Sequence, residues 1–437
     1  MNTLESHLTA FLSELPVKFP AQLISAQKWR AISDSQATGE TVIDLPMSIS
    51  ISCAQAIDPL RSENSYKLAQ EAFDSDVVFS KAPSLAGYWG AFAQVLHAAI
   101  LKSAKLSEGG VEINIVQTII EFQKLRDIFS ATTISFSAKA RLFGVALNTS
   151  PLSLPEGTVA KKLSLDERNE KQPVSHHFDS SHYLSSYVQA STELTLPLSF
   201  IVDESQENPH QHCASKASDT ANEIFQKIVD ASLVVFPNAV RASPIKIEGG
   251  VANIGQRIDF DPIYPAPINQ LDVAEREKIA VIYKCLSPSN KDKTLAGSLH
   301  RFILGRKRRD TIDRLVDYVI AWEALLLTNE GSSLNQELSY RFALNGALLI
   351  RSVDKDASPT QINKQLRSAY ATRSAVVHGI NDKERDEKLK VGDFSNLNDL
   401  CSFLENKYRL TIFQLAKIEP HLRPYRAAGG WDKLLWE

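Results

Sequence analysis

The feature that most constrains this 437-residue chain is a change of sequence pattern near residues 286–300. Before it, short runs alternate apolar and polar residues, as half-buried strands do, and helical stretches lie between them. After it, apolar residues recur at helical spacing. A chain of this length has room for two or three domains. We therefore predict a multidomain protein with an α+β region over 1–290, an all-α helical bundle over 296–420 and a tail over 421–437.

The N-terminal region combines alternating strands with polar segments. Its clearest strand covers 194–200, where leucines and a phenylalanine occupy every second position. The Pro- and Ser-rich segment 151–182 and the polar segment 203–220 predict surface loops. A helix near 221–229 is expected to lead into further strands at 231–236 and 245–254. The topology of this region does not follow from the sequence.

The C-terminal bundle is predicted to contain helices with recognisable ends, over about 307–327, 333–350, 358–379 and 396–418. Ser333 and Gln336 have the spacing of a capping box. The third helix is the best specified, because Ser358 suits the N-cap, Pro359 the first helical position and Gly379 the position after the last turn.

Three of these helices place a charged residue on the face that should be apolar, namely Glu323, Arg341 and Arg373. Glu323, for example, returns to within about 20° of the apolar Ile312 at 100° per residue. A buried charge is costly unless it is paired, so we expect these residues to meet one another or an anion. The plainer alternative is a Glu323–Arg341 pair that only fixes helix packing.

Arg373, Ser374 and His378 bring three chemical groups to the end of the third helix. Ser374 and His378 are four residues apart and share a face, and the long side chain of Arg373 flanks it. His378 lies in the last turn, where the helix dipole favours a cation. Cleavage of a phosphodiester without a metal needs such a set, since a guanidinium binds the phosphate and an imidazole transfers a proton.

Residues 296–420 resemble the HEPN superfamily, and most closely its Apea-like branch. The resemblance is carried by these segments, in the order of the family: Asp313–Tyr318 running into Ala321–Leu326, Glu337–Ala343, and Tyr370 followed by Arg373–Gly379. Members are typically metal-independent endoribonucleases whose Arg-x4–6-His motif forms a composite site across a homodimer. The resemblance implies that Arg373 and His378 are catalytic, with Ser374 as their polar neighbour. Glu323 matches the interior acid of the family, and we expect it to support the site together with Arg341.

The reaction that the resemblance implies is attack by an RNA 2′-hydroxyl on the adjacent phosphate, without a cofactor. It leaves a 2′,3′-cyclic phosphate and a 5′-hydroxyl, with His378 as general acid and base and Arg373 stabilising the phosphorane. A basic run is predicted to guide the RNA backbone: Arg306, Lys307, Arg308 and Arg309. The alternative for this run is a solvated helix start, although arginines at a helix N-terminus oppose the dipole.

The distribution of charge indicates which part of the chain meets RNA. The net charge of −3 argues against a protein that coats nucleic acid with its whole surface. Residues 296–437, however, hold 22 basic and 18 acidic residues, a net charge of +4, which leaves −7 for the rest. No apolar stretch is long enough to span a membrane, no signal peptide is recognised and the four cysteines are scattered, so we expect a cytoplasmic protein without a membrane partner.

A group of potential metal ligands lies in the polar segments of the N-terminal region: His176, His177, His182, His210, His212 and Cys213. Zinc held by His210, His212 and one of the earlier pair of histidines, His176 and His177, is an open alternative. The His-x-His-Cys spacing is not a recurrent zinc motif, and histidines in loops are usually solvated. The prediction is therefore a protein without a metal site.

The 1–290 region carries no motif that we can name. A ribonuclease without control would be toxic to its own cell, so we expect this region to be a sensor or a substrate-selecting module. The resemblance implies an anti-phage abortive-infection effector, set off by a phage-derived or cellular trigger, with tRNA as a candidate target. Two alternatives stay open: an inactive HEPN dimer that binds RNA or a protein, because the family often has Asn, Asp or His in place of Ser374, and a component of a toxin–antitoxin pair.

Overall fold

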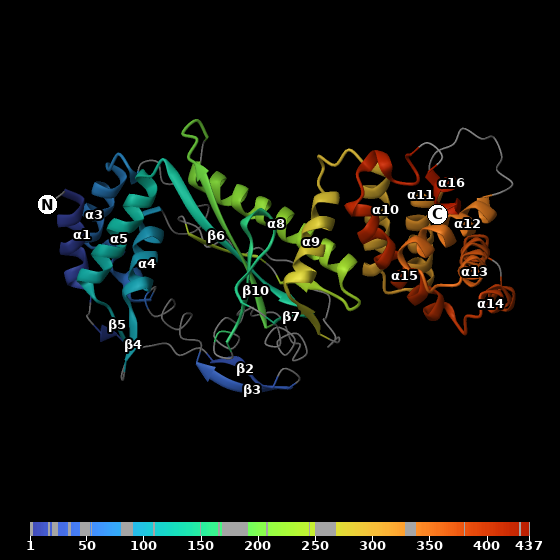
Figure 1. Ribbon diagram of the computed structural model, residues 1–437. Helices are drawn as coiled ribbons and strands as arrows, with labels where there is room; N and C mark the ends of the chain where they lie inside the picture. The colour runs from blue at the N-terminus through green and yellow to red at the C-terminus, as the bar shows by residue number, and fades with distance from the viewer. Residues whose placement is uncertain are drawn as a thin grey trace. The chain divides into compact units, whose positions relative to one another are not determined.

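The computed structural model in Figure 1 describes residues 3–15, 18–19, 25–33, 36–43, 53, 55–79, 91–107, 110–148, 150–164, 167, 191–206, 209–243, 245–249, 268–327, 338–379, 381–427 and 430–436. The chain divides into two compact units. The N-terminal unit comprises Met1–Phe143, Gly157–Glu223 and Ser243–Pro265, and the C-terminal unit comprises Gly144–Glu156, Ile224–Ala242 and Ala266–Glu437. The C-terminal unit thus takes in segments that lie outside the predicted 296–420 domain.

Helices of the N-terminal unit pack side by side around an aromatic core (Figure 1): α1 (Thr3–Glu14), η1 (Asp58–Ser62), α3 (Asn64–Asp74), α4 (Ala91–Ser103) and α5 (Ile115–Ser130). Phe11 meets Tyr66 with ring centroids 5.2 Å apart, and Tyr66 meets Phe92 at the same distance. The side chain of Asn114 begins α5 by accepting a hydrogen bond from the N–H of Gln117, as an N-cap does.

Strands of the N-terminal unit include a long antiparallel pair, β6 (Thr133–Phe143) and β10 (Thr192–Ile201). Leu194 lies opposite Ala140 and Leu196 opposite Ala138, all of them buried, which confirms the predicted strand at 194–200. β9 (Val159–Lys162) pairs with the other edge of β10, and β12 (Lys246–Gly249) pairs with β6. The shorter strands of the unit are β1 (Lys18–Phe19), β2 (Ser25–Ser33), β3 (Gln36–Ile43), β4 (Lys105–Ser107) and β5 (Gly110–Glu112); β5 lies between β1 and β4, and β2 pairs with β3.

The loop predicted at 203–220 and the strand predicted at 231–236 were both wrong, because one helix, α8 (Pro209–Val235), covers most of these residues. Small and aromatic side chains are buried along it at helical spacing: Ala214, Ala217, Ala221, Phe225 and Ile228. The polar residues between them form the outer face of an amphipathic helix. The apolar run that suggested a strand is the last turns of the same helix, where packing overrides the β preference of valine.

The C-terminal unit is largely helical, with α9 (Val273–Cys285), α10 (Lys293–Lys307), α11 (Thr311–Leu326), α12 (Leu338–Val353), α13 (Pro359–Val377), α14 (Asp382–Val391), α15 (Leu397–Lys417), η5 (Pro420–Leu422) and α16 (Gly430–Trp436). It also holds the short elements β7 (Val145–Leu147), β8 (Leu152–Ser153), β11 (Arg241–Ala242) and β13 (Asn269–Leu271), and η3 (Pro155–Gly157) begins within it. α10 packs on α11, α11 on α15, and α12 on α13 (Figure 1). At the centre, Tyr408 stacks on Phe302 at 4.2 Å and meets Trp322 edge-on at 5.5 Å.

Helix ends in this unit test the caps that the sequence predicts. The Ser358 side chain accepts a hydrogen bond from the N–H of Gln361, and Gly379 has φ +67° just beyond α13, so both predictions are confirmed. The predicted helix over 307–327 was wrong at its start, because Lys307 ends α10 and Asp310 caps a separate helix, α11. The predicted capping box at Ser333 and Gln336 lies outside the described residues.

The predicted tail over 421–437 is attached to the start of α10. Asp292 is fully buried there, accepts a hydrogen bond from the hydroxyl of Tyr425 at 2.8 Å, and pairs with Arg423 and Arg426. The side chain of Asp292 also caps α10 through the N–H of Leu295. Among the described residues, we find no helix that combines the length and apolarity required to cross a bilayer.

Candidate functional site

Arg373, Ser374 and His378 all belong to the end of α13. Arg373 and Ser374 are half-buried within the helix, while His378 is its C-cap and is exposed. The N–H of His378 donates to the Ser374 carbonyl at 3.1 Å, and that of Gly379 donates to Val376 at 3.1 Å, where the positive φ of Gly379 ends the helix. The chain therefore turns away after His378 and leaves its imidazole at an open helix end.

The directions of the side chains around α13 decide which of these three residues one copy of the chain can bring together. Ser374 and His378 lie about 40° apart around the helix, whereas Arg373 and His378, five residues apart, lie about 140° apart. Arg373 faces the bundle, and its Nη2 lies 3.7 Å from Oε2 of Glu323 on α11. A single chain thus places Ser374 beside His378 but directs Arg373 elsewhere.

The contact between Glu323 and Arg373 is a loose ion pair. Their side chains are 21% and 25% exposed, and the Nε of Arg373 is buried without a hydrogen-bond partner among the described residues. Burial raises the pKa of Glu323, and the charge of Arg373 opposes this only in part. Arg373 is thus a cation that the fold holds through one weak contact, with a donor left over.

Tyr370 is part of the same cluster, although the sequence suggested no role for it. Burial, and then the charge of Glu323, raises the pKa of its phenol, while Arg373 opposes them. Its ring packs against Phe342 of α12 with centroids 5.3 Å apart. The available signal was its position three residues before Arg373, which puts both side chains on one face of α13.

Arg341 lies in the first turn of α12 and is half-buried. The Glu323–Arg341 pair was the plainer alternative for these residues, but the ion pair that we find for Glu323 is with Arg373. Tyr340 directly precedes Arg341, and the guanidinium of Arg367 lies 5.4 Å from the centroid of its ring. α12 and α13 therefore also meet through a cation–π contact.

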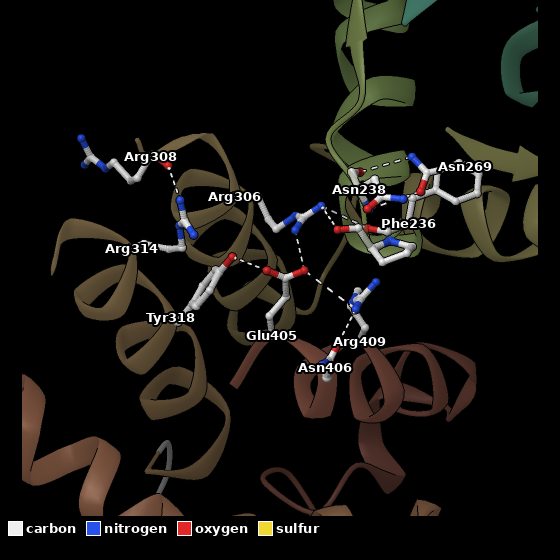
Figure 2. Close-up of polar contacts among 11 residues, drawn as sticks. Phe236, Asn238, Asn269, Arg306, Arg308, Arg314, Tyr318, Glu405, Asn406 and Arg409 are labelled. Carbon is white, nitrogen blue, oxygen red and sulfur yellow. Dashed lines mark hydrogen bonds and ion pairs between the residues drawn. The ribbon is translucent and has the colours of Figure 1, made fainter. Parts of the chain in front are cut away.

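The predicted basic run does not form one surface. Arg306 points inward: its guanidinium pairs with Glu405 and donates to the carbonyls of Phe236 and Pro237 at 3.2 and 2.9 Å (Figure 2). Lys307 pairs with Asp230 at 2.6 Å. Both residues lie in the last turn of α10, where the helix dipole favours cations, so the expectation that they begin a helix was wrong.

Arg308 does not share the partner of Arg306, and its side chain remains half exposed. Its Nε donates to the buried Asp317 at 3.0 Å, which raises the pKa of Arg308. The carboxylate of Asp317 also pairs with the guanidinium of Arg301 on α10 at 3.3 Å, so it binds two guanidinium groups. Arg301 was not predicted, because it precedes the basic run by more than a helical turn. Arg309 is exposed beyond the end of α10.

The candidate metal ligands that the structure describes lie on α8. His210 and Cys213 are buried, with His210 Nε2 3.3 Å from the Ile128 carbonyl and Cys213 donating to the Ile201 carbonyl at 3.7 Å. His212 is exposed. The remaining three, His176, His177 and His182, lie outside the described residues. Within the part of the chain that the structure describes, we find no group of three or more His, Cys, Asp or Glu side chains that could hold a metal ion.

No family model, curated protein or solved structure matches this chain.

Proposed function

We propose that this protein is a metal-independent endoribonuclease of the HEPN type that acts as a homodimer. The observation that carries the proposal is the pair of residues at the end of α13: a loosely held and partly exposed Arg373, and an exposed His378. A guanidinium of this kind can exchange Glu323 for a phosphate, because charge-assisted hydrogen bonds to phosphate are strong and geometrically specific.

In the proposed reaction, the 2′-oxygen of RNA attacks the adjacent phosphorus and the bond to the 5′-oxygen breaks. His378 takes the proton of the 2′-hydroxyl or supplies one to the leaving 5′-oxygen, and Arg373 stabilises the charge on the phosphorane. Ser374 shares the face of His378 and can orient the phosphate or the imidazole by a hydrogen bond.

The divergence of Arg373 and His378 around α13 favours a site built from two copies of the chain. Two α13 ends brought together by a two-fold axis would present the histidine of one copy to the phosphate bound by the arginine of the other. Within each copy, Glu323 then acts as a positioning residue, since it keeps Arg373 within the bundle until RNA binds.

We further propose that the enzyme serves in anti-phage defence, with the N-terminal region holding the activity in check until a phage-derived or cellular trigger arrives. The net charges of −7 and +4 on the two parts of the sequence support RNA binding by the C-terminal part, with tRNA as a candidate substrate.

The test is to incubate the purified full chain with labelled tRNA and total RNA in EDTA, alone and with an extract of phage-infected cells as the source of the trigger, and to map the ends. We expect 2′,3′-cyclic phosphate and 5′-hydroxyl ends, no cleavage of DNA, and a fall in rate of about 10²–10⁴-fold for His378→Ala. Arg373→Ala is expected to lose about 10²–10³-fold. The matched control is His300→Ala, which removes an exposed histidine from α10. Intact RNA with the wild-type chain under both conditions, or equal cleavage by all three variants, contradicts the proposal.

A second candidate, a HEPN dimer that binds RNA or a protein without cleaving it, is favoured by the ion pair itself. In each chain, Glu323 already neutralises Arg373. This candidate predicts RNA binding, or capture of a protein partner, with no cyclic phosphate ends in the same experiment. The two candidates therefore separate on the chemistry of the ends rather than on affinity.

A further inference from the structure

A pocket of about 480 Å³ lies in the C-terminal unit and shares no lining residue with the proposed cleavage site. Its walls come from the last residues of α8, from α9 and from α15. Its volume is within the range of sites that take small molecules. Residues on α8 and α9 contribute to it, so it draws on elements that lie outside the predicted 296–420 bundle.

The pocket is positively charged. Lys278 and Arg409 are among the residues that line it, and none of the described lining residues is acidic. Lys278 is partly balanced by Glu275, whose carboxylate lies 3.2 Å from its ammonium group. Because Lys278 keeps a large part of its side chain exposed, its ammonium group can still approach a ligand.

Arg409 is the more unusual of the two cations. Its Nη2 donates to Asn406 and lies 3.8 Å from Glu405, while its Nε is buried without a hydrogen-bond partner among the described residues (Figure 2). Glu405 also pairs with Arg306 and accepts the Tyr318 hydroxyl at 2.9 Å. One carboxylate thus serves two guanidinium groups, and a positive charge is left over at the wall of the pocket.

The environment of Arg409 makes an additional anion favourable. Burial lowers the pKa of its guanidinium; Glu405 opposes this shift and the charge of Arg306 adds to it. A group that is desolvated and faces a like charge is stabilised by any anion that enters the pocket. The structure therefore points to a ligand with a negative charge at the Arg409 end.

The rest of the pocket suits a flat and largely apolar group. Phe413 and Leu410 of α15 line it together with the aliphatic side chains of Val234 and Ile282. The ammonium group of Lys278 is 5.9 Å from the centroid of the Phe413 ring, and that of Lys417, at the end of α15, is 4.2 Å from it.

Gln414, also in the lining, offers an amide that both donates and accepts hydrogen bonds. A nucleobase combines a flat apolar face with hydrogen-bonding edges, which matches Phe413 and Gln414 together. Simple fatty or acyl anions lack these edges and would not use the amide of Gln414, which is exposed.

We propose that this pocket binds a free nucleoside phosphate, with the phosphate between Lys278 and Arg409 and the base against Phe413 and Gln414. This inference goes beyond the proposed ribonuclease activity and does not depend on it, because binding is measured without cleavage. A ligand at this position contacts α8, α9 and α15 at once, so it is suited to act as a regulatory signal for the C-terminal unit.

The test is isothermal titration of the full chain with the four nucleoside monophosphates, and with inorganic phosphate, an unphosphorylated nucleoside, octanoate and a short oligoribonucleotide. We expect a nucleoside monophosphate to bind more tightly than inorganic phosphate, the nucleoside or octanoate. Lys278→Gln and Arg409→Lys should each weaken it by about ten-fold, as the loss of a charged hydrogen bond does.

The matched control is Lys284→Gln, on the same helix as Lys278 but lining a different pocket. It should leave the affinity unchanged. Lys278→Gln alters a side chain that is 41% exposed, so its result does not depend on whether Arg409→Lys folds. The proposal is overturned if no nucleotide binds at millimolar concentration, if Lys278→Gln and Lys284→Gln have the same effect, or if octanoate or inorganic phosphate binds as tightly. Binding of the oligoribonucleotide alone also overturns it and assigns the pocket to an RNA strand.

Discussion

Arg306 and Arg373 are both arginines of the C-terminal unit paired with a glutamate, yet their surroundings differ. The side chain of Arg306 is 9% exposed, pairs closely with Glu405 and donates to two backbone carbonyls. Arg373 is 25% exposed, and the ion pair that we find for it is the 3.7 Å contact with Glu323. In both arginines the buried Nε lacks a hydrogen-bond partner among the described residues. A buried guanidinium with a close ion pair and two carbonyl acceptors contributes to stability, whereas a more exposed one with a single long contact is available to a ligand.

Removal of Glu405 tests most directly whether Arg306 contributes to stability. Glu405→Ala leaves Arg306 and Arg409 without their shared carboxylate and the Tyr318 hydroxyl without its acceptor. We expect the free energy of unfolding to fall by about 3–5 kcal/mol, because a buried charge is left unpaired. Urea denaturation followed by circular dichroism measures it.

The control for this experiment is Glu419→Ala, which removes an exposed glutamate that makes no side-chain cap at η5. Its effect should stay within about 0.5 kcal/mol. A loss below about 1 kcal/mol for Glu405→Ala would mean that water replaces the carboxylate easily, and Arg306 would then be no more structural than Arg373.

α11 connects the two surroundings, since it carries Tyr318 near its middle and Glu323 near its end. Asp310 caps this helix and accepts hydrogen bonds from the N–H groups of Ile312 and Asp313 at 2.8 and 3.0 Å. Asp310→Ala should cost about 1 kcal/mol of unfolding free energy. Asp313→Ala, in the same turn but without the capping contacts, should cost less, and equal losses would show that only the helix dipole is at work.

Local signals allowed part of this structure to be predicted. The caps at Ser358 and Gly379 were recognised because a cap depends on residues within one turn. The inward position of Glu323 followed from helical periodicity, but its partner did not, since that depends on how two helices pack. The orientation of Arg306 was missed for the same reason, because Glu405 lies 99 residues further along the chain.

α8 shows a second limit of sequence patterns. Its first half is rich in polar residues, as loops are, and its last turns are rich in valine, as strands are. The buried small residues that define its inner face, such as Ala217 and Ala221, carry little hydrophobic signal by themselves. These small residues define a buried face only once the helix packs against its neighbours.

Truncation of each arginine in turn measures how much each guanidinium contributes to stability. Arg373→Ala should lower the free energy of unfolding by less than about 1 kcal/mol, as expected for a loose and partly exposed pair. Arg306→Ala should cost more, because Glu405 then loses its closest partner and two carbonyls lose their donor. The same urea series measures both variants, and similar losses would remove the distinction between them.

Glu323 should make the free energy of unfolding depend on pH, and this effect should be smaller than those of the substitutions above. Burial raises the pKa of Glu323 above its ordinary value of 4.5, with Arg373 opposing the shift. The folded chain then holds this proton more tightly than the unfolded chain, so the contribution of Glu323 to stability falls as the pH rises through the interval between the two pKa values.

Glu323→Gln cannot ionise and lacks this decrease. The unfolding free energy of Glu323→Gln minus that of the wild type should therefore rise with pH above about 4.5 and then level off, while other titrating groups cancel in the difference. Urea denaturation at several pH values between about 4 and 7 gives this curve. A difference that falls with pH would mean that the pair with Arg373 outweighs burial, and the loose contact would then be as firmly held as that of Arg306.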